Sequence, residues 1–263
     1  MADYATIRLE QSGGVASVTL ARPDAANAFD ETMARELAEV AEQCDGDRSV
    51  RVVLITGVGT MFSAGGDLRS FAQQGEALPE HLRTVTRHAH AAFSRFARMR
   101  APVIAAVNGA AAGIGMSLVA ACDLAIAADT ARFTLAYTRV GLTPDGGSTY
   151  TLPRIVGLKR ALELVLSNPA LTASQALEWG LVNRVVPADE LAQAARAWAE
   201  ELARGPAGAL GTAKRLMRLG AGDGFEAQME LESQAIAEAG ATADAREGIA
   251  AFLGRRAPAF PGN

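Results

Sequence analysis

The sequence predicts an α/β fold with parallel strands and a helical C-terminal region, and three observations indicate it. Apolar runs with little alternation, such as Val50–Thr56, are typical of strands that are buried on both faces of a sheet. Helical patterns separate these runs, as expected where helices connect parallel strands. After about residue 158 the strand patterns almost vanish, and long segments rich in Ala, Leu, Glu and Arg follow. We therefore expect a core domain over 1–195 and a helical domain over 196–263.

The chain begins with a hairpin and a capped helix. Residues 5–20 alternate as two short strands around Ser12-Gly13-Gly14, which is a hairpin signal. Asp30 is a suitable N-cap for a helix over 31–44. The later core elements are expected to be helices over 80–99 and 114–121 and buried strands over 102–107 and 123–127. The C-terminal part adds a strand over 182–186 and helices over 189–204, 206–219, 223–239 and 242–253.

Composition and charge exclude several classes of protein. With 49% hydrophobic and 21% charged residues over its 263 residues, the chain has an ordinary globular balance and can bury a sizeable core. Its 25 Lys and Arg against 29 Asp and Glu give a formal charge of −4, which argues against nucleic acid as a partner. Cys44 and Cys122 form no CxxC pair, so neither a structural zinc site nor a disulfide framework is supported.

Targeting and membrane signals are not visible in the sequence. The first residues, MADYATIRLEQ, have no apolar run behind basic residues, so no signal peptide is indicated. The longest apolar stretch, 101–106, is far shorter than the ~20 residues that a transmembrane helix needs. We expect a soluble cytoplasmic protein without a membrane partner.

Three glycine-rich stretches each follow a strand or a strand-like segment: 62–68, 108–115 and 141–147. Glycines at such turns often serve only as punctuation. At the entry to a helix, however, they leave backbone N–H groups free and let a ligand approach closely. Two such turns can direct two N–H donors at one oxygen, so the pattern indicates a possible oxyanion hole.

Other catalytic signatures are missing. The sequence has no GxGxxG after its first strand, no GxxxxGK[ST] and no GxSxG. The three histidines, His81, His88 and His90, lie on one predicted helix, and no further ligand completes a metal site. His90 lies about 120° from the centre of the apolar stripe of that helix, which predicts a solvated or boundary side chain.

An ordered set of longer motifs spans almost the whole chain: FSAGGDL, AAVNGAAAGIGMSL, CDLAIAADTARF, VGLTPDGG, LPRIVG, ALEWGLVNRVV and AREGIAAFLGRRAPAF. Together they resemble the crotonase (enoyl-CoA hydratase/isomerase) superfamily. The resemblance implies a spiral of ββα units with a helical C-terminal trimerisation region, and acyl-CoA thioesters as substrates. It also implies that two peptide N–H groups stabilise a thioester enolate. No separate cofactor or metal is implied, because coenzyme A is part of the substrate.

Carried over position by position, the resemblance assigns the two oxyanion donors to the N–H groups of Gly66 and Ile114. A backbone donor is kept with any side chain except proline, so an isoleucine can serve at the second position. The positions that match the lining of the coenzyme A and acyl site are Arg22, Ala26, Ala64, Asp67, Leu68 and Tyr137. A role for Arg22 is plausible because arginine suits phosphate, although a surface arginine without such a role is equally compatible with the sequence.

The departures from the family pattern are informative. Classical hydratases carry two catalytic glutamates, which here fall on Ser117 and Tyr137, so hydration by two glutamates is doubtful. Asp145 matches the acid/base of enoyl-CoA isomerase relatives of the phenylacetate-pathway type. The same position is the nucleophile of 4-chlorobenzoyl-CoA dehalogenase, which also has a histidine where this chain has His90. That dehalogenase has tryptophan where Tyr137 stands.

We therefore expect an enoyl-CoA isomerase that uses Asp145 as its acid/base and assembles as a homotrimer or hexamer. The Gly146-Gly147 pair after Asp145 follows the isomerase pattern. An enoyl-CoA hydratase, a dehalogenase-like hydrolase and a non-catalytic acyl-CoA-binding protein remain alternatives. Asp145 itself lies in a Pro-Asp-Gly sequence, which is also a common turn.

Overall fold

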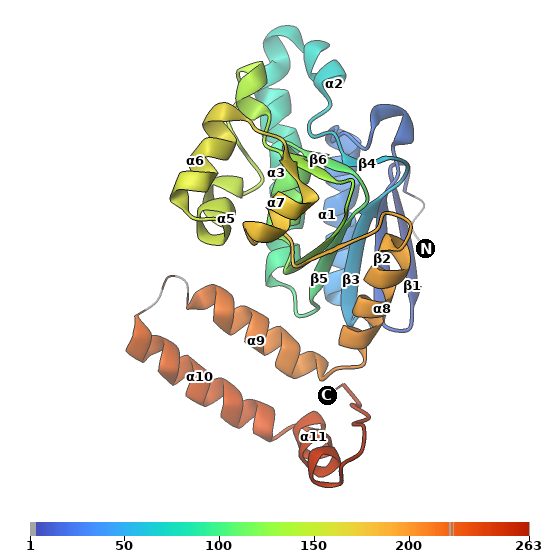
Figure 1. Cartoon of the computed structure of the whole chain (residues 1–263), viewed down its shortest axis with the longest axis vertical. Helices are drawn as coiled ribbons and strands as arrows, with labels where there is room; N and C mark the ends of the chain where they lie inside the picture. Colours follow the sequence, from blue (N-terminus) through green and yellow to red (C-terminus); the bar gives the residue numbers. More distant parts are fainter. Residues whose placement is uncertain (1–3, 221, 223, 263) are drawn as a thin grey trace.

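The computed structural model describes residues 4–262 except 221 and 223, and its strands form two sheets (Figure 1). The larger sheet consists of β1 (Ile7–Ser12), β2 (Val15–Leu20), β3 (Val52–Gly57), β5 (Val103–Val107), β7 (Leu124–Ala128) and β10 (Arg184–Val186), in that order. Only β1 and β2 pair antiparallel in it; the other neighbours are parallel. The smaller sheet has the order β4 (Met61–Ser63), β6 (Ala110–Ala112), β8 (Arg132–Thr134) and β9 (Leu171–Thr172).

The two sheets arise from a repeated pattern in which a long strand, a short strand and a helix follow one another. The long strands β3, β5 and β7 enter the larger sheet, and the short strands β4, β6 and β8 that follow them enter the smaller one. The helices after these short strands are α2 (Leu68–Ala72), α3 (Leu78–Arg98), α4 (Ile114–Ala121), α5 (Ser148–Ile155) and α6 (Leu158–Ser167). This arrangement confirms the predicted α/β spiral of ββα units.

Burial of the central strands on both faces is confirmed. Val53 and Ile55 of β3 belong to a core that also contains the apolar stripes of α1 (Glu31–Gly46) and α3. Val52 and Leu54 point the other way, into a second core covered by α8 (Leu191–Ala203). The alternation of side chains along a strand therefore divides one apolar run between two cores.

Polar side chains form hydrogen bonds with backbone groups at or near the ends of these central strands. Each accepts a hydrogen bond from a backbone N–H of a strand to which it does not itself belong. The three bonds are Val103 N to Asp123 Oδ2 at 2.9 Å, Gly57 N to Asn108 Oδ1 at 3.2 Å and Ala125 N to Asn183 Oδ1 at 2.8 Å.

The C-terminal helices divide into those that pack on the sheet and those that extend from it. The domain boundary predicted at residue 195 lies inside α8. The apolar side chains of this helix pack against the larger sheet on both sides of that residue. The next helix, α9 (Ala207–Leu219), is joined to the core by Lys214, whose Nζ lies 2.6 Å from Asp123 Oδ2. Burial lowers the pKa of Lys214, and the Asp123 carboxylate opposes that effect.

Beyond α9, the chain forms α10 (Phe225–Gly240) and α11 (Ala243–Leu253), which lie away from the sheets (Figure 1). Residue 223, the predicted start of α10, lies outside the described residues. Large apolar side chains of both helices are exposed: Phe225, Met229, Ile236, Ile249, Phe252 and Leu253. Within the described part of the chain, none of the helices combines the length and apolar content needed to cross a membrane.

Candidate active site

The candidate site lies where the short strands of the smaller sheet end. Because β4, β6 and β8 are parallel neighbours, their carboxyl ends meet at one edge, where ligands commonly bind in α/β proteins. A cavity of about 380 Å³ lies there. Its wall includes these residues singled out from the sequence: Ala64, Gly66, Leu68, Ile114, Tyr137 and Asp145. Apolar side chains line much of the remaining wall, among them Phe29, Phe71, Leu82, Val85, Leu135 and Leu142.

The first predicted donor is the N–H of Gly66. The carbonyl of Gly65 accepts a hydrogen bond from Phe29 N at 2.7 Å. In a trans peptide the C=O and the following N–H point in opposite directions, so the Gly66 N–H points away from Phe29. Within the described part of the chain this N–H has no acceptor, and Gly66 lines the cavity. Gly66 thus offers a free donor to a ligand.

The second predicted donor is the N–H of Ile114, the first residue of α4. Its position in the helix leaves the N–H without an intrahelical partner, and no acceptor occurs among the described residues. The carbonyl of Gly113, in the same peptide unit, accepts from Ser117 N at 3.1 Å, so the Ile114 N–H points the other way. The positive end of the α4 dipole adds to its attraction for an anion.

Two glycines bring these peptides together. Gly65 has φ +99° and Gly113 has φ +51°, both in the region that side chains disfavour. A Cβ on Gly113 would lie 3.4 Å from the Cα of Gly65, and a Cβ on Gly65 would lie 3.5 Å from the Cα of Gly113. The positive φ angles account for glycine at both positions, and at Gly65 a Cβ would also lie 3.1 Å from the carbonyl oxygen of Ala112. The van der Waals contact between the two backbones brings together the two peptides that carry the free N–H groups.

Asp145 is half-buried in the wall of the same cavity, between η3 (Tyr137–Val140) and α5. Its Oδ1 accepts a short hydrogen bond from the hydroxyl of Tyr137. Burial raises the pKa of Asp145, while the hydrogen bond from Tyr137 opposes the rise. Burial, and secondly the Asp145 charge, raises the pKa of Tyr137. A carboxylate with a raised pKa in an apolar cavity is suited to exchange protons with a ligand.

His90 lies beside this loop. The side chain is exposed, which confirms the predicted boundary position, yet its Nε2 accepts a hydrogen bond from Gly146 N at 3.0 Å. An accepting Nε2 is unprotonated, so the neutral ring carries its hydrogen on Nδ1. Helical periodicity could not show this contact, because it depends on how α3 packs against the loop after Asp145.

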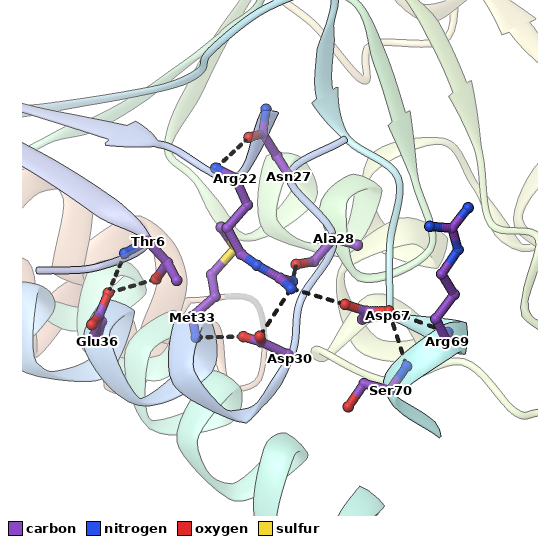
Figure 2. A network of polar contacts seen from close by, with 10 residues as sticks. All are labelled: Thr6, Arg22, Asn27, Ala28, Asp30, Met33, Glu36, Asp67, Arg69 and Ser70. Atoms are coloured by element: carbon purple, nitrogen blue, oxygen red, sulfur yellow. Dashed lines mark hydrogen bonds and ion pairs between the residues drawn. The ribbon is translucent and has the colours of Figure 1, made fainter. Parts of the chain in front are cut away.

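Arg22, Ala26 and Asp67 lie outside the cavity wall. The guanidinium of Arg22 stands between two carboxylates, 3.0 Å from Asp30 Oδ2 and 3.0 Å from Asp67 Oδ2, as Figure 2 shows. Asp30 caps α1, and Asp67 caps α2 by accepting from Ser70 N at 3.1 Å. Arg22 therefore joins the starts of two helices.

Carboxylate contacts and backbone hydrogen bonds hold the loop that carries Gly66, the first donor, in place. Partial burial favours a higher pKa for Asp67, but the bond from Ser70 N and the Arg22 guanidinium outweigh it and lower the pKa. The backbone of Ala26 contributes by accepting from Ala64 N at 2.9 Å. The positions predicted to touch coenzyme A thus include three that support the loop carrying Gly66.

The apolar wall of the cavity could not be recognised from the amino-acid sequence. Phe71 comes from the short helix α2, and Leu82 and Val85 come from α3. On a helical wheel Leu82 and Val85 belong to the ordinary apolar stripe of α3. The sequence gives no signal that distinguishes a side chain facing a cavity from one facing the core.

Comparison with known proteins extends these observations. A family model described as "Enoyl-CoA hydratase/isomerase" matches residues 10–263. The 1,2-epoxyphenylacetyl-CoA isomerase of Escherichia coli is 40% identical over 251 residues, which cover 95% of each chain. A 4-chlorobenzoyl coenzyme A dehalogenase of an Arthrobacter species is 35% identical over 231 residues, covering 88% of this chain and 84% of that one.

Solved structures show similarity to the same family of proteins. The crystal structure of an enoyl-CoA hydratase from Polaromonas sp. JS666 has a TM-score of 0.93 and 32% identity, and the match covers 97% of this chain and 99% of that chain. The similarity therefore extends over almost the whole chain, including the C-terminal helices.

Proposed function

The chain belongs to the enoyl-CoA hydratase/isomerase family, and from this membership we propose that it shifts a double bond within an enoyl-CoA thioester. The observation that carries the proposal is the pairing of two free N–H donors with one carboxylate. Asp145 is the only carboxyl group among the described residues that line the cavity. Ser117 and Tyr137 occupy the positions that the family resemblance associates with the two glutamates of hydratases.

The proposed reaction moves one proton. Asp145 removes a proton from the carbon alpha to the thioester of a 3-enoyl-CoA, and the electrons of that C–H bond form a dienolate. The N–H groups of Gly66 and Ile114 stabilise the negative oxygen. The gamma carbon then takes the proton back from Asp145, which leaves the double bond conjugated with the thioester.

General acid/base transfer of this kind contributes roughly 10²–10⁴-fold to the rate. Loss of one oxyanion donor costs about 10²–10³-fold. The starting material and the product are isomers, so the proposed step needs no oxidant, reductant or metal ion. We therefore propose that the enzyme works without a separate cofactor.

The shape of the site supports a bulky acyl group. Phe29, Phe71 and Leu82 contribute to the apolar wall beside the donor groups. Apolar and aromatic walls of this kind favour hydrocarbon or aryl substituents. Since one relative bears the name 1,2-epoxyphenylacetyl-CoA isomerase, aryl-substituted thioesters belong in the substrate test beside aliphatic ones.

A dehalogenase-like reaction is the second candidate, and the place of His90 beside the Asp145 loop favours it. In that reaction Asp145 attacks an aromatic carbon and chloride leaves. Water activated by His90 then hydrolyses the resulting aryl ester, which frees 4-hydroxybenzoyl-CoA and restores the Asp145 carboxylate. Two observations favour the isomerase instead. The Nε2 lone pair of His90 is engaged by Gly146 N, and a tyrosine stands where that dehalogenase has tryptophan.

Assembly and location are part of the proposal. Six large apolar side chains of α10 and α11 are exposed, and exposed apolar surface of this kind often marks a protein–protein interface. We propose that neighbouring copies cover it in a homotrimer or a dimer of trimers. We further propose that the enzyme acts in the cytoplasm.

A substrate panel tests the proposed function. Purified protein is incubated separately with a 3-enoyl-CoA, crotonyl-CoA and 4-chlorobenzoyl-CoA, and products are separated by chromatography. The proposal predicts that the 3-enoyl-CoA becomes the 2-enoyl isomer and that this conversion is the fastest of the three. Faster hydration of crotonyl-CoA or release of chloride would contradict it. Binding of all three thioesters without turnover would indicate an acyl-CoA-binding protein.

A further inference from the structure

A chain of hydroxyl groups leads from the interior to Asp145. The Tyr137 hydroxyl donates to Asp145 Oδ1, and it lies 3.2 Å from the Oγ of Ser117. Ser117 lies on α4 and is completely buried. A Cβ added to Gly146 would lie 2.7 Å from the Cβ of Ser117, so the loop that follows Asp145 packs directly against this serine. Three elements, α4, η3 and the loop before α5, thus meet at these hydroxyls.

The direction of the hydrogen bonds follows from the number of hydrogens. A tyrosine hydroxyl has one hydrogen, and Tyr137 gives it to Asp145. The contact between Ser117 and Tyr137 is therefore a hydrogen bond only when Ser117 donates. The other acceptor within reach of Ser117 Oγ is the carbonyl of Gly113, at the longer distance of 3.3 Å. Both hydroxyl dipoles then point toward the carboxylate, and each bond strengthens the other.

We propose that Tyr137, supported by Ser117, is a positioning residue that keeps Asp145 ionised and leaves one carboxylate oxygen to exchange protons with the substrate. The proton-exchange part of this inference rests on the proposed function. The carboxylate would otherwise face a largely apolar wall, where its charged form is disfavoured. With Oδ1 held by Tyr137, Oδ2 both removes and returns the proton, so the two transfers use the same atom.

Few other titratable groups act on Asp145. His90 approaches from α3, but its Nε2 is engaged by Gly146 N rather than by the carboxylate. Arg83 of α3 and Arg139 of η3 line the same cavity, and Arg139 donates to the carbonyl of Asn168. From α4 the facing residue is the uncharged Ser117. Among the groups named here, Tyr137 is therefore the one that donates a hydrogen bond directly to the Asp145 carboxylate.

The test measures the protonation of Asp145 directly. Infrared difference spectra are recorded while the full-length protein is titrated, and the carboxyl signal that disappears in Asp145→Asn is assigned to this residue. Loss of a hydrogen bond to a charged group corresponds to roughly one to two pH units. We expect Tyr137→Phe to raise the Asp145 midpoint by about that amount, and Ser117→Ala to raise it by less. The acidic limb of kcat/KM for the isomerisation should move upward by the same amounts.

Tyr150→Phe is the matched control, because Tyr150 is an exposed tyrosine on α5 that does not line the cavity. This variant should leave the midpoint unchanged. An unchanged midpoint in a folded Tyr137→Phe variant overturns the inference, as does an equal shift in Tyr150→Phe. If the midpoint moves as expected while no thioester is isomerised, the proposed function fails, but the action of Tyr137 on Asp145 stands.

Discussion

Replacing Asp145 by asparagine removes the proposed base while changing little else. The side-chain carbonyl of asparagine can still accept the hydrogen bond from Tyr137. The bonds that hold the neighbouring loop, Gly146 N to His90 Nε2 and Ser148 Oγ to the carbonyl of residue 145, involve backbone atoms and remain. The two N–H donors belong to other loops. An amide nitrogen cannot take up the substrate proton, so this variant tests only the role of Asp145 as a base.

We expect kcat for isomerisation of a 3-enoyl-CoA to fall by at least ~10²-fold, and by up to ~10⁴-fold if the carboxylate supplies the full effect of a general base. This loss corresponds to about 3–5 kcal/mol of activation free energy. KM should change little, because the apolar wall and both donors stay in place, so kcat/KM should fall in parallel.

The assay follows both formation of the 2-enoyl isomer and the departure of deuterium from the alpha carbon of a substrate labelled there. Circular dichroism and acyl-CoA binding serve as folding controls. A folded variant that keeps near-wild-type turnover and deuterium loss would show that Asp145 is only a turn residue and not the catalytic base.

The remaining predictions concern the donor loops, Arg22, His90 and the assembly. Gly113→Ala forces a side chain into a glycine conformation and should destabilise the fold by about 1–3 kcal/mol. By displacing the Ile114 N–H it should also lower kcat about 10²–10³-fold; unchanged kinetics would rule out that donor. Arg22→Gln should lower the thermal midpoint, because two helix-capping carboxylates lose their partner, while KM stays within a few-fold. A raised KM at full stability would instead assign Arg22 to coenzyme A. His90→Gln should leave isomerisation within a few-fold of wild type, since Asp145 alone exchanges protons. An aryl adduct on Asp145 in that variant after exposure to 4-chlorobenzoyl-CoA, detected by mass spectrometry, would support the dehalogenase. Light scattering should give a mass of three chains or a multiple of three, because α10 and α11 leave apolar side chains exposed; the mass of a single chain at micromolar concentration would contradict assembly.

Much of the fold could be predicted because its strongest signals are local. The run Val50–Thr56 is long and β-branched, and it contains nearly all of β3. Asp30 caps α1 as predicted, since its Oδ1 accepts from Met33 N at 2.8 Å. The order of helices and strands also indicated parallel neighbours. Each of these features depends on residues that are close together in the sequence.

The smaller sheet could not be predicted from local pattern. Its strands β4, β6 and β8 have three residues each, too few to display a period of two. Ala110–Ala112 contains no β-branched residue, although it is an inner strand of the smaller sheet. These strands exist because the larger sheet and the helices bring them together. The resemblance to the family supplied what periodicity could not.

Contacts within the site are also tertiary. Tyr137 reaches Asp145 across a short 3₁₀ helix that follows Ala136, a residue in the left-handed conformation. His90 contacts Gly146 over a separation of 56 residues. The sequence identified Asp145, His90 and Tyr137 as candidates, but it could not show that Tyr137 donates to Asp145 or that His90 accepts from Gly146 N. Such contacts depend on packing angles that no single segment specifies.

The two-sided burial of the central strands has a consequence for the fidelity of folding. A strand with one apolar face loses its burial when its pairing slips by one residue, so hydrophobicity alone fixes its alignment. In β3, β5 and β7 both faces are apolar, and a slipped pairing would still bury most of its side chains. The correct alignment must then depend on directional polar contacts between strands, such as those that the carboxylate of Asp123 and the amides of Asn108 and Asn183 accept. These three polar side chains distinguish the native alignment from its nearest competitors, and the spacing of the two N–H donors depends on that alignment.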